Sequence, residues 1–429
     1  MLFNYVLGVQ LSKEKKGIKH HSNKIVLTIG IIANLVLLGY FKYADFFISN
    51  INIVLGSDIP LLHLALPLAI SFYTFQQIAY LVDSYRGETK EYDFLNYSVF
   101  VTFFPQLIAG PIVHHSEMMP QFKTVRNQVK NYRNIAVGLF IFSIGLFKKV
   151  VIADSFAVWA NNGFDVAETL SFFEAWVTSL SYTFQLYFDF SGYTDMAIGI
   201  ALLFNIKLPI NFNSPYKATS IQDFWRRWHI TLSRFLKEYI YIPLGGNRKG
   251  EIRTYTNLFS TFLLGGIWHG AGWTFVVWGA MHGLALVIHR AWQQLGFKMH
   301  ALLGWFITFN FINVAWVFFR ANTFEDALKV LGGMVNIHQI EISNNLYGYL
   351  NFLTEYGIQF SPWLQVLQGN KFTLVWLLCA FIITLGFKTT LEYGKYFKPS
   401  YKTLFFVAIL VLCNMIFINQ QSTFLYFNF

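Results

Sequence analysis

Charge is scarce in this sequence. Of its 429 residues only 13% are Asp, Glu, Lys or Arg, whereas 55% are hydrophobic. A water-soluble domain of this length does not need so much apolar surface, which excludes an ordinary soluble globular protein. Uncharged runs of about 16 or more residues recur, each near the length of a helix that crosses a bilayer. About eleven such segments, some of them broken, predict an all-α polytopic membrane protein with a single domain, residues 1–429.

Cysteine is also rare, and several signature motifs are missing. Cys379 and Cys413 lie far apart in late apolar runs, so they offer neither metal-ligand spacing nor a disulfide framework, and we expect them to be packing residues. The sequence contains no Gly-x-Ser-x-Gly elbow and no His-Glu-x-x-His pair. Serine-hydrolase and zinc mechanisms therefore have no support, and no metal is predicted.

The net charge of +10 would suit a nucleic-acid partner, but its distribution does not. Lys and Arg cluster in short loops between apolar runs, among them residues 13–24, 123–133 and 243–250. Positive loops of this kind orient a protein with those loops in the cytoplasm and contact membrane lipids. No basic soluble domain with interleaved aromatic residues is present, so nucleic-acid binding is not expected.

The start of the chain is short for a membrane segment. Residues 1–11 are apolar but too few to span a bilayer, and no cleavable signal peptide is visible. We therefore expect that one or two upstream helices are missing from this sequence.

The run Gly-Gly-Ile-Trp-His-Gly-Ala-Gly-Trp, residues 265–273, places an ionisable side chain at membrane depth. An imidazole in hydrocarbon is costly, so such a histidine usually faces a bundle interior or a wet cavity. The glycines allow backbone or ligand to approach closely, and the tryptophans supply flat walls with N–H donors. A structural role for His269 in a helix–helix seam and a functional role both fit.

Two other stretches carry polar or helix-breaking residues among apolar ones. Two prolines and a glycine interrupt residues 103–112, which fits either a kinked span or a re-entrant cavity wall. Asp189 and Asp195 lie in or near apolar runs, and we expect them to pair with arginines or tyrosine hydroxyls rather than with a metal.

Residues 222–239 have the pattern of an amphipathic helix lying in the membrane interface. At about 100° per residue, one face is apolar and aromatic and the opposite face is basic. The apolar face contains Trp225, Trp228, Leu232, Phe235, Leu236 and Tyr239. His229 lies at the boundary and turns toward the apolar side, where an interfacial role and a role inside the core both fit.

Three motifs together resemble the membrane-bound O-acyltransferases, and most closely the bacterial alginate and peptidoglycan O-acetyltransferases. They are Trp-Arg-Arg-Trp-His at 225–229, Ile-Pro-Leu-Gly-Gly-Asn-Arg at 242–248 and Trp-His-Gly at 268–270. Phe-Pro-Gln-Leu-Ile-Ala-Gly-Pro-Ile at 104–112 and Tyr-Phe-Asp-Phe-Ser-Gly-Tyr at 187–193 are similar to that branch as well.

The resemblance implies a ring of helices around a thin centre, with funnels from both faces that meet near the family's invariant histidine, here His269. The second family histidine corresponds to His229. It also implies that acetyl from cytoplasmic acetyl-CoA crosses the bacterial inner membrane. A periplasmic esterase-like (SGNH) O-acetyltransferase would then esterify a peptidoglycan or alginate-like polysaccharide. The aromatic tail, residues 420–429, is similar to a motif proposed to relay the acyl group through a tyrosine, here Tyr426.

The resulting hypothesis is acyl transfer from a thioester to a hydroxyl. Neutral His269 acts as the general base, while His229 positions the donor or stabilises the oxyanion, with tryptophan N–H groups as further donors. We assign donor binding to Trp225 and to four basic residues, for which lipid binding fits as well. The basic residues are Arg226, Arg227, Arg248 and Lys249.

A different class of function also accommodates broken helices and an intramembrane histidine. It is a proton-coupled transporter, or a non-catalytic scaffold of a polysaccharide-modification complex. The sequence shows no internal repeat and has few intramembrane carboxylates, which counts against this alternative.

Overall fold

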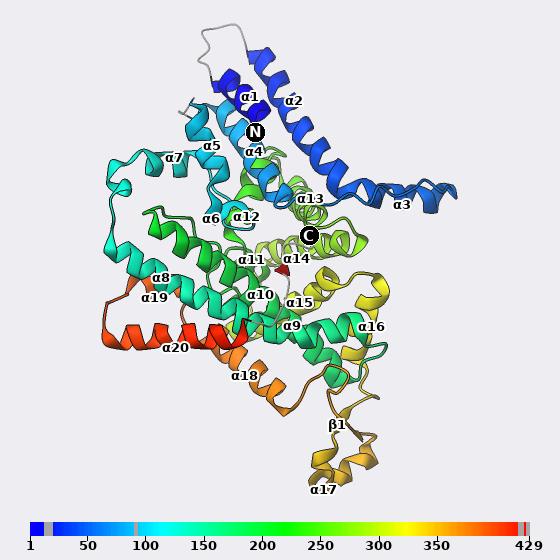
Figure 1. Ribbon diagram of the computed structural model, residues 1–429. Helices are drawn as coiled ribbons and strands as arrows, with labels where there is room; N and C mark the ends of the chain where they lie inside the picture. The colour runs from blue at the N-terminus through cyan, green and yellow to red at the C-terminus, as the bar shows by residue number, and fades with distance from the viewer. Residues whose placement is uncertain (13–19, 90–92, 419–423, 426–429) are drawn as a thin grey trace.

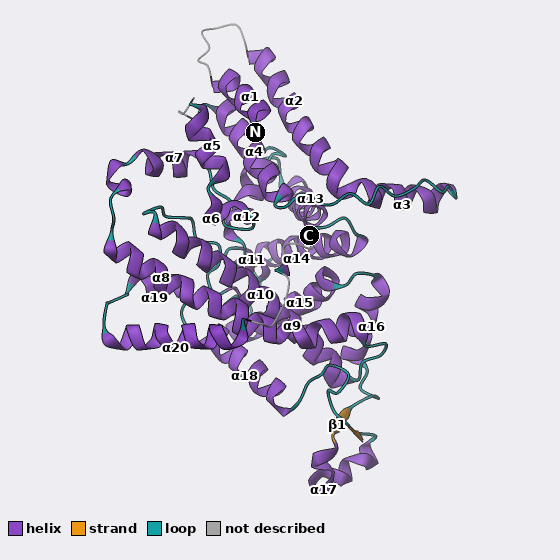
Figure 2. Ribbon diagram, viewed as in Figure 1, coloured by secondary structure: helices purple, strands orange, loops and turns teal. Residues whose placement is uncertain are grey.

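The computed structural model describes residues 1–12, 20–89, 93–418 and 424–425. Across these residues the chain is mostly helical, with very little strand (Figures 1 and 2). In the amino-terminal half the helices are α1 Leu2–Ser12, α2 His20–Leu38, α3 Ala44–Leu55, α4 Ile70–Arg86, α5 Phe94–Thr102, α6 Phe104–Leu107, α7 His115–Lys123, α8 Tyr132–Phe147, α9 Asp154–Asn161 and α10 Phe172–Leu203.

The carboxy-terminal half continues with α11 Ile221–Trp225, α12 Ile230–Leu236, α13 Glu251–His269, α14 Trp273–Gln294, α15 Ala301–Arg320, α16 Phe324–Val335, α17 Tyr347–Leu350, α18 Lys371–Gly386, α19 Thr390–Lys395 and α20 Tyr401–Phe417. Two short parallel strands, β1 Glu341–Ser343 and β2 Gln359–Ser361, pair beside α17 at one edge of the molecule (Figure 2). Short π-helical segments, η1 Gly39–Tyr43, η3 Lys148–Ala153, η4 Asn162–Val166 and η6 Lys237–Tyr241, join or extend several helices.

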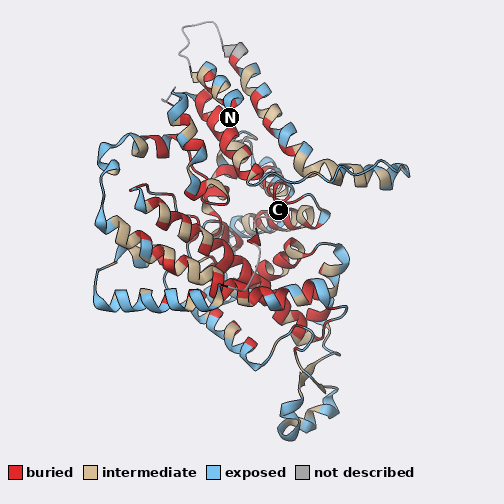
Figure 3. Cartoon of the chain, viewed as in Figure 1, coloured by how far each residue is buried: buried red, intermediate tan, exposed pale blue. Residues whose placement is uncertain are grey.

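The predicted all-α polytopic membrane architecture is confirmed. Within the described residues, three helical stretches are long and apolar enough to cross a membrane: Asn23–Leu55, Tyr132–Val166 and Ala301–Arg320. The helices Lys371–Gly386 and Tyr401–Phe417 are apolar but shorter. Large hydrophobic side chains are exposed along the peripheral helices, as expected where lipid is the solvent (Figure 3).

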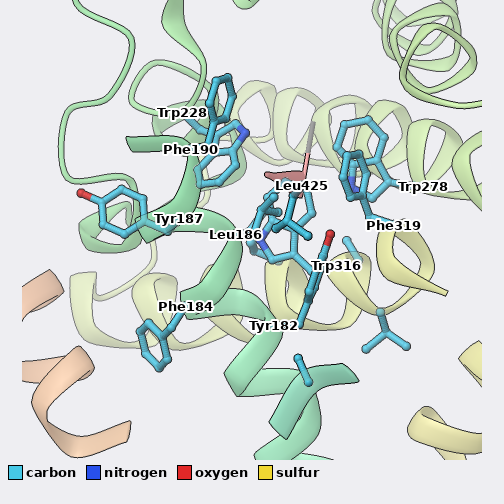
Figure 4. Packing of buried hydrophobic residues seen from close by; sticks show 14 of the residues in the cluster. Tyr182, Phe184, Leu186, Tyr187, Phe190, Trp228, Trp278, Trp316, Phe319 and Leu425 are labelled. Atoms are coloured by element: carbon cyan, nitrogen blue, oxygen red, sulfur yellow. The ribbon is translucent and has the colours of Figure 1, made fainter. Parts of the chain in front are cut away.

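Helix α10 forms the centre of the fold and packs closely on α8. A Cβ at Gly145 would lie 2.7 Å from the carbonyl oxygen of Gly192, and one at Gly199 would lie 2.6 Å from that of Gly138. Glycines at both crossings therefore let the two backbones approach, which is how small residues drive helix association in lipid. Around α10 lies a buried cluster rich in aromatic residues (Figures 3 and 4).

The prediction of one continuous helix over residues 222–239 is wrong. Helix α11 ends at Trp225, α12 begins at Ile230, and His229 between them has a left-handed backbone with φ 43° and ψ 53°. The N–H of Ile230 donates to the carbonyl of Asn211 at 3.0 Å instead of continuing a helix. The apolar side chains still share one side, but they face the protein core rather than the lipid interface.

The second half of the broken stretch at 103–112 lies in the protein interior, whereas Phe104 is exposed. After the short helix α6 the chain is not helical until α7, and residues 109–115 are buried. The N–H of Ile112 donates to the hydroxyl of Thr231 at 3.0 Å, and its carbonyl accepts from Arg234 at 3.3 Å. Backbone groups released from the helix therefore find partners inside the protein, as the re-entrant interpretation requires.

Candidate active site

His269 is the last residue of α13 and is buried among aromatic rings. Its ring centroid lies 4.8 Å from that of Trp268, 5.0 Å from that of Trp278 and 5.1 Å from that of Phe319. Trp278 and Phe319 belong to α14 and α15, and both pack on Trp316 (Figure 4). Three helices that are consecutive in sequence thus enclose the imidazole in a water-poor environment.

His269 also borders a cavity. A space of about 90 Å³ lies between the end of α13 and the segment that leads into α4, and His269, Trp268, Phe72 and Lys42 help to line it. A second, wider cavity of about 310 Å³ adjoins Lys42 and the residues just after His269, Gly270 and Ala271. The imidazole is therefore buried in protein but faces open space on one side.

The second predicted histidine, His229, lies against the same aromatic wall. The ring of Phe72 is 6.3 Å from that of His229 and 5.6 Å from that of Trp268, the neighbour of His269. His229 is fully buried, and its Nδ1 lies 3.2 Å from the side-chain oxygen of Asn211. The structure thus brings the two histidines predicted from sequence to one site.

A third buried histidine was missed by the sequence analysis. His282 of α14 is fully buried, and its Nδ1 accepts a hydrogen bond from the indole N–H of Trp225 at 3.2 Å. The ring of Trp278 lies between the histidines, 4.7 Å from His282 and 5.0 Å from His269. The sequence signal that could have identified His282 is an ionisable residue within an apolar helix. Trp225, predicted to bind the donor, thus also contacts His282 through its indole N–H.

The structure places two of the four basic residues predicted to bind the donor far from His269. Arg226, Arg248 and Lys249 are exposed, and Arg227 pairs with Asp223 at 2.8 Å. Arg248 and Lys249 precede α13, whereas His269 ends it, and a helix of 19 residues separates the two ends by roughly 28 Å. The structure therefore places these two cations and the imidazole at opposite ends of one helix.

The intramembrane aspartates pair with lysines, not with arginines or tyrosine hydroxyls as predicted. Lys148 Nζ lies 2.6 Å from Asp195, and Lys149 Nζ lies 2.7 Å from both Asp154 and Asp189. The helical path does not end at these two lysines but continues through them to Val166. Because each lysine ammonium lies against at least one carboxylate, its charge is compensated inside the fold.

The last described residues also reach this cluster. The N–H of Leu425 donates to Asp189 Oδ2 at 3.2 Å, and the ring of Phe424 stacks on that of Tyr193 at 4.6 Å. Both residues are buried (Figure 4 shows Leu425 in the core). Only these two residues of the predicted tail, 420–429, are described, and Tyr426 lies outside the described residues.

Three buried histidines, one of them lining a cavity, lie inside a helical protein with membrane-length apolar helices, which defines the class as an integral-membrane protein with a candidate site at depth. The family model for the membrane-bound O-acyltransferases matches residues 82–324, more than half of the chain. The chain belongs to this family and is an acyltransferase. Both His229 and His269 lie within the matched residues.

Three relatives of this chain have names that also describe the transfer of an acyl group to a cell-wall or extracellular polymer. The chain is 51% identical over its whole length to the peptidoglycan O-acetyltransferase of Helicobacter pylori, and the match covers 86% of that protein. It is 41% identical to a probable alginate O-acetylase of Azotobacter vinelandii, over 80% of this chain and 69% of the relative. A teichoic acid D-alanyltransferase of Streptococcus thermophilus is 27% identical, over 59% of this chain and 68% of the relative.

Proposed function

We propose that this protein moves an acetyl group from cytoplasmic acetyl-CoA across the bacterial inner membrane for O-acetylation of a polysaccharide. The acceptor is peptidoglycan or an alginate-like polymer, and a periplasmic SGNH esterase-like protein completes the transfer. The observation that carries the proposal is the position of His269, buried at the end of α13 and open to a cavity, in a chain that matches this family. The names of the relatives favour acetyl as the acyl group.

In the proposed reaction, the oxygen of the hydroxyl that takes up the acetyl group at this site, before the periplasmic partner passes it to the polymer, attacks the carbonyl carbon of the acetyl thioester. His269 takes the hydroxyl proton as the carbon–oxygen bond forms. The tetrahedral intermediate then collapses, the carbon–sulfur bond breaks, and the proton returns from His269 to the thiolate. The neutral form of the imidazole is the one that can accept this proton, and the aromatic rings around it exclude water.

The surrounding groups support this chemistry. The indole N–H groups of Trp268 and Trp278 are buried and make no hydrogen bond to the described residues, so they are available to an oxyanion. His229 is held by Asn211 to orient the donor or share in that stabilisation. Tyr426 is proposed to relay the acyl group.

The orientation of the protein in the membrane is inferred from the position of its basic loops. The basic loop at 243–250 is assigned to the cytoplasm, where Arg226, Arg227, Arg248 and Lys249 would meet the phosphates of the donor. The end of α13 that carries His269, and the cavity beside it, then face the periplasmic half. The alternative of a transporter or scaffold is not favoured by membership of an acyltransferase family.

The test is mass spectrometry of cell-wall fragments from cells with the gene, without it, and with a His269→Ala copy. We expect O-acetylated fragments only with the parent gene. Equal acetylation in all three strains would refute the proposal. Loss of acetyl from another extracellular polymer, with peptidoglycan unchanged, would show that the acceptor is not peptidoglycan.

A further inference from the structure

Lys42 is a cation inside a membrane-spanning stretch, and it reaches the carbonyl end of α13. Its Nζ donates to the carbonyl oxygens of Trp268 at 2.7 Å and His269 at 2.9 Å, and to the hydroxyl of Ser71 at 3.2 Å. The proposed reaction gives this side chain no role, although it contacts the residue proposed to perform the chemistry.

The contact follows from the physics of helix ends. The last carbonyls of a helix have no partner within it and carry partial negative charge, so a cation there is stabilising. The hydroxyl of Tyr43, the next residue, donates to the carbonyl of Ile267 at 2.7 Å. Both side chains come from η1, the π-helical segment that interrupts the spanning helix, and interruptions of this kind often occur at functional sites.

The ammonium of Lys42 is not neutralised by an acid. Among the described residues Lys42 forms no ion pair, because its three nearest polar partners are the two carbonyls and the hydroxyl. Asp45, one turn further on, is engaged instead by the backbone N–H groups of Leu62 and His63 at 2.7 and 3.0 Å. In its protonated form Lys42 therefore places a positive charge beside this space.

The side chain of Lys42 borders two cavities. Lys42 and Leu66 line both the cavity of about 90 Å³ that His269 also lines and the wider cavity of about 310 Å³. A group that passed from one cavity to the other beside these two residues would come close to the ammonium. A cation in a low-dielectric wall favours anions and disfavours cations in such a passage.

We propose that Lys42 is a positioning residue for the transfer step and makes the approach to His269 selective for anionic oxygen. It fixes the backbone of His269 through its hydrogen bonds to the carbonyls of Trp268 and His269, and its charge favours anionic over cationic groups in the space beside it. The positioning role rests on the proposed function, whereas the charge selectivity of the passage does not.

Charge selectivity is tested without any activity assay. Leu66→Cys is introduced with Cys379→Ser and Cys413→Ser, and the purified protein reacts with thiosulfonate reagents of similar size, one anionic and one cationic. We expect the introduced thiol to favour the anionic reagent, and this preference to fall by about fivefold or more when Lys42→Met is added. Tyr43→Phe, which removes a neighbouring cap without changing charge, should leave the preference unchanged. An unchanged preference in the Lys42→Met protein would overturn the anion site.

The positioning role is tested by the rate of acetyl transfer with the partner present. Lys42→Met should lower kcat about tenfold or more while the KM for the acetyl donor stays near that of the parent, and Lys42→Arg should restore most of the rate. A Lys42→Met protein with the parent kcat would overturn the positioning role. If His269→Ala also transfers at the parent rate, the proposed function fails, and the reagent preference still decides whether the passage attracts anions.

Discussion

The side-chain oxygen of Asn211 lies 3.2 Å from Nδ1 of His229, and the same oxygen accepts the N–H and the hydroxyl of Thr231 at 3.2 and 2.9 Å. An atom that accepts two donors from Thr231 is an acceptor toward His229 as well, so Nδ1 carries the proton. The lone pair of His229 is then on Nε2. In His282 the assignment is reversed, because its Nδ1 accepts from Trp225.

Replacing Asn211 should therefore impair both folding and transfer. Asn211→Ala leaves buried donors of Thr231 and His229 without their acceptor, which costs about 1–3 kcal/mol of stability. Misplacement of His229 should lower kcat about tenfold or more. Thermal unfolding in detergent and acetyl-transfer rates measure the two effects. The matched control is Asn213→Ala, an exposed asparagine two residues away, which should change neither.

Gly270 controls the space next to His269. A Cβ at this position would lie 2.1 Å from the ring of Phe275, whose ring centroid is 5.2 Å from that of Phe319, a neighbour of His269. Gly270→Ala should displace these rings and lower the transfer rate about tenfold, with a stability loss of about 1–3 kcal/mol.

A second substitution provides the test of that explanation. Phe275→Ala added to Gly270→Ala should recover transfer relative to the single variant, because the clash is removed. Gly272→Ala, where a Cβ would lie 3.5 Å from the same ring, should be tolerated. If Gly270→Ala transfers acetyl as fast as Gly272→Ala, then a clash with the ring of Phe275 does not explain why residue 270 is glycine.

Lys148 and Asp195 form a largely buried ion pair, so the stability contributed by one side chain depends on the presence of the other. Either Lys148→Met or Asp195→Leu leaves one charge in the core and should destabilise the protein by about 3 kcal/mol. The double variant removes both charges and should regain most of that loss. Unfolding of the four proteins measures the coupling. Additive losses in the double variant would show that the two side chains do not act as a pair.

The basic loop before α13 should affect donor binding rather than chemistry. Arg248→Ala with Lys249→Ala is expected to raise the KM for acetyl-CoA several-fold while kcat changes little, since both side chains are exposed and far from His269. Added salt should raise the parent KM toward that of the variant. Lys298→Ala, an exposed cation elsewhere, is the control. An unchanged KM in the double variant would assign these residues to lipid contact and orientation.

Much of the fold was predictable because lipid imposes strong constraints. Low charge and long apolar runs allow little except a helical membrane protein, and a histidine between glycines at depth marked the site. The amphipathic pattern of 222–239 also correctly separated the side chains that are buried from those that are more exposed. It could not reveal the break at His229, because that break depends on Asn211, whose contact is made through the tertiary fold.

Lys42 and the lysine–aspartate pairs show a different limit. Lys42 follows directly on an apolar run, yet it contacts a helix terminus 226 residues away. Lys148 and Lys149 likewise follow an apolar run. Lysines at the ends of apolar runs usually reach water, and only the three-dimensional arrangement shows that these three find carbonyls or carboxylates inside the protein.

The most direct measurement is the rate of acetyl transfer from acetyl-CoA by purified parent and His269→Ala proteins, each reconstituted in lipid vesicles with the periplasmic partner outside. Thermal unfolding and binding of acetyl-CoA serve as controls that the variant is folded and still engages the donor. We predict transfer by the parent and loss of at least about a hundredfold in rate for His269→Ala, with donor binding retained. Transfer at the parent rate by a folded His269→Ala protein would contradict the central claim.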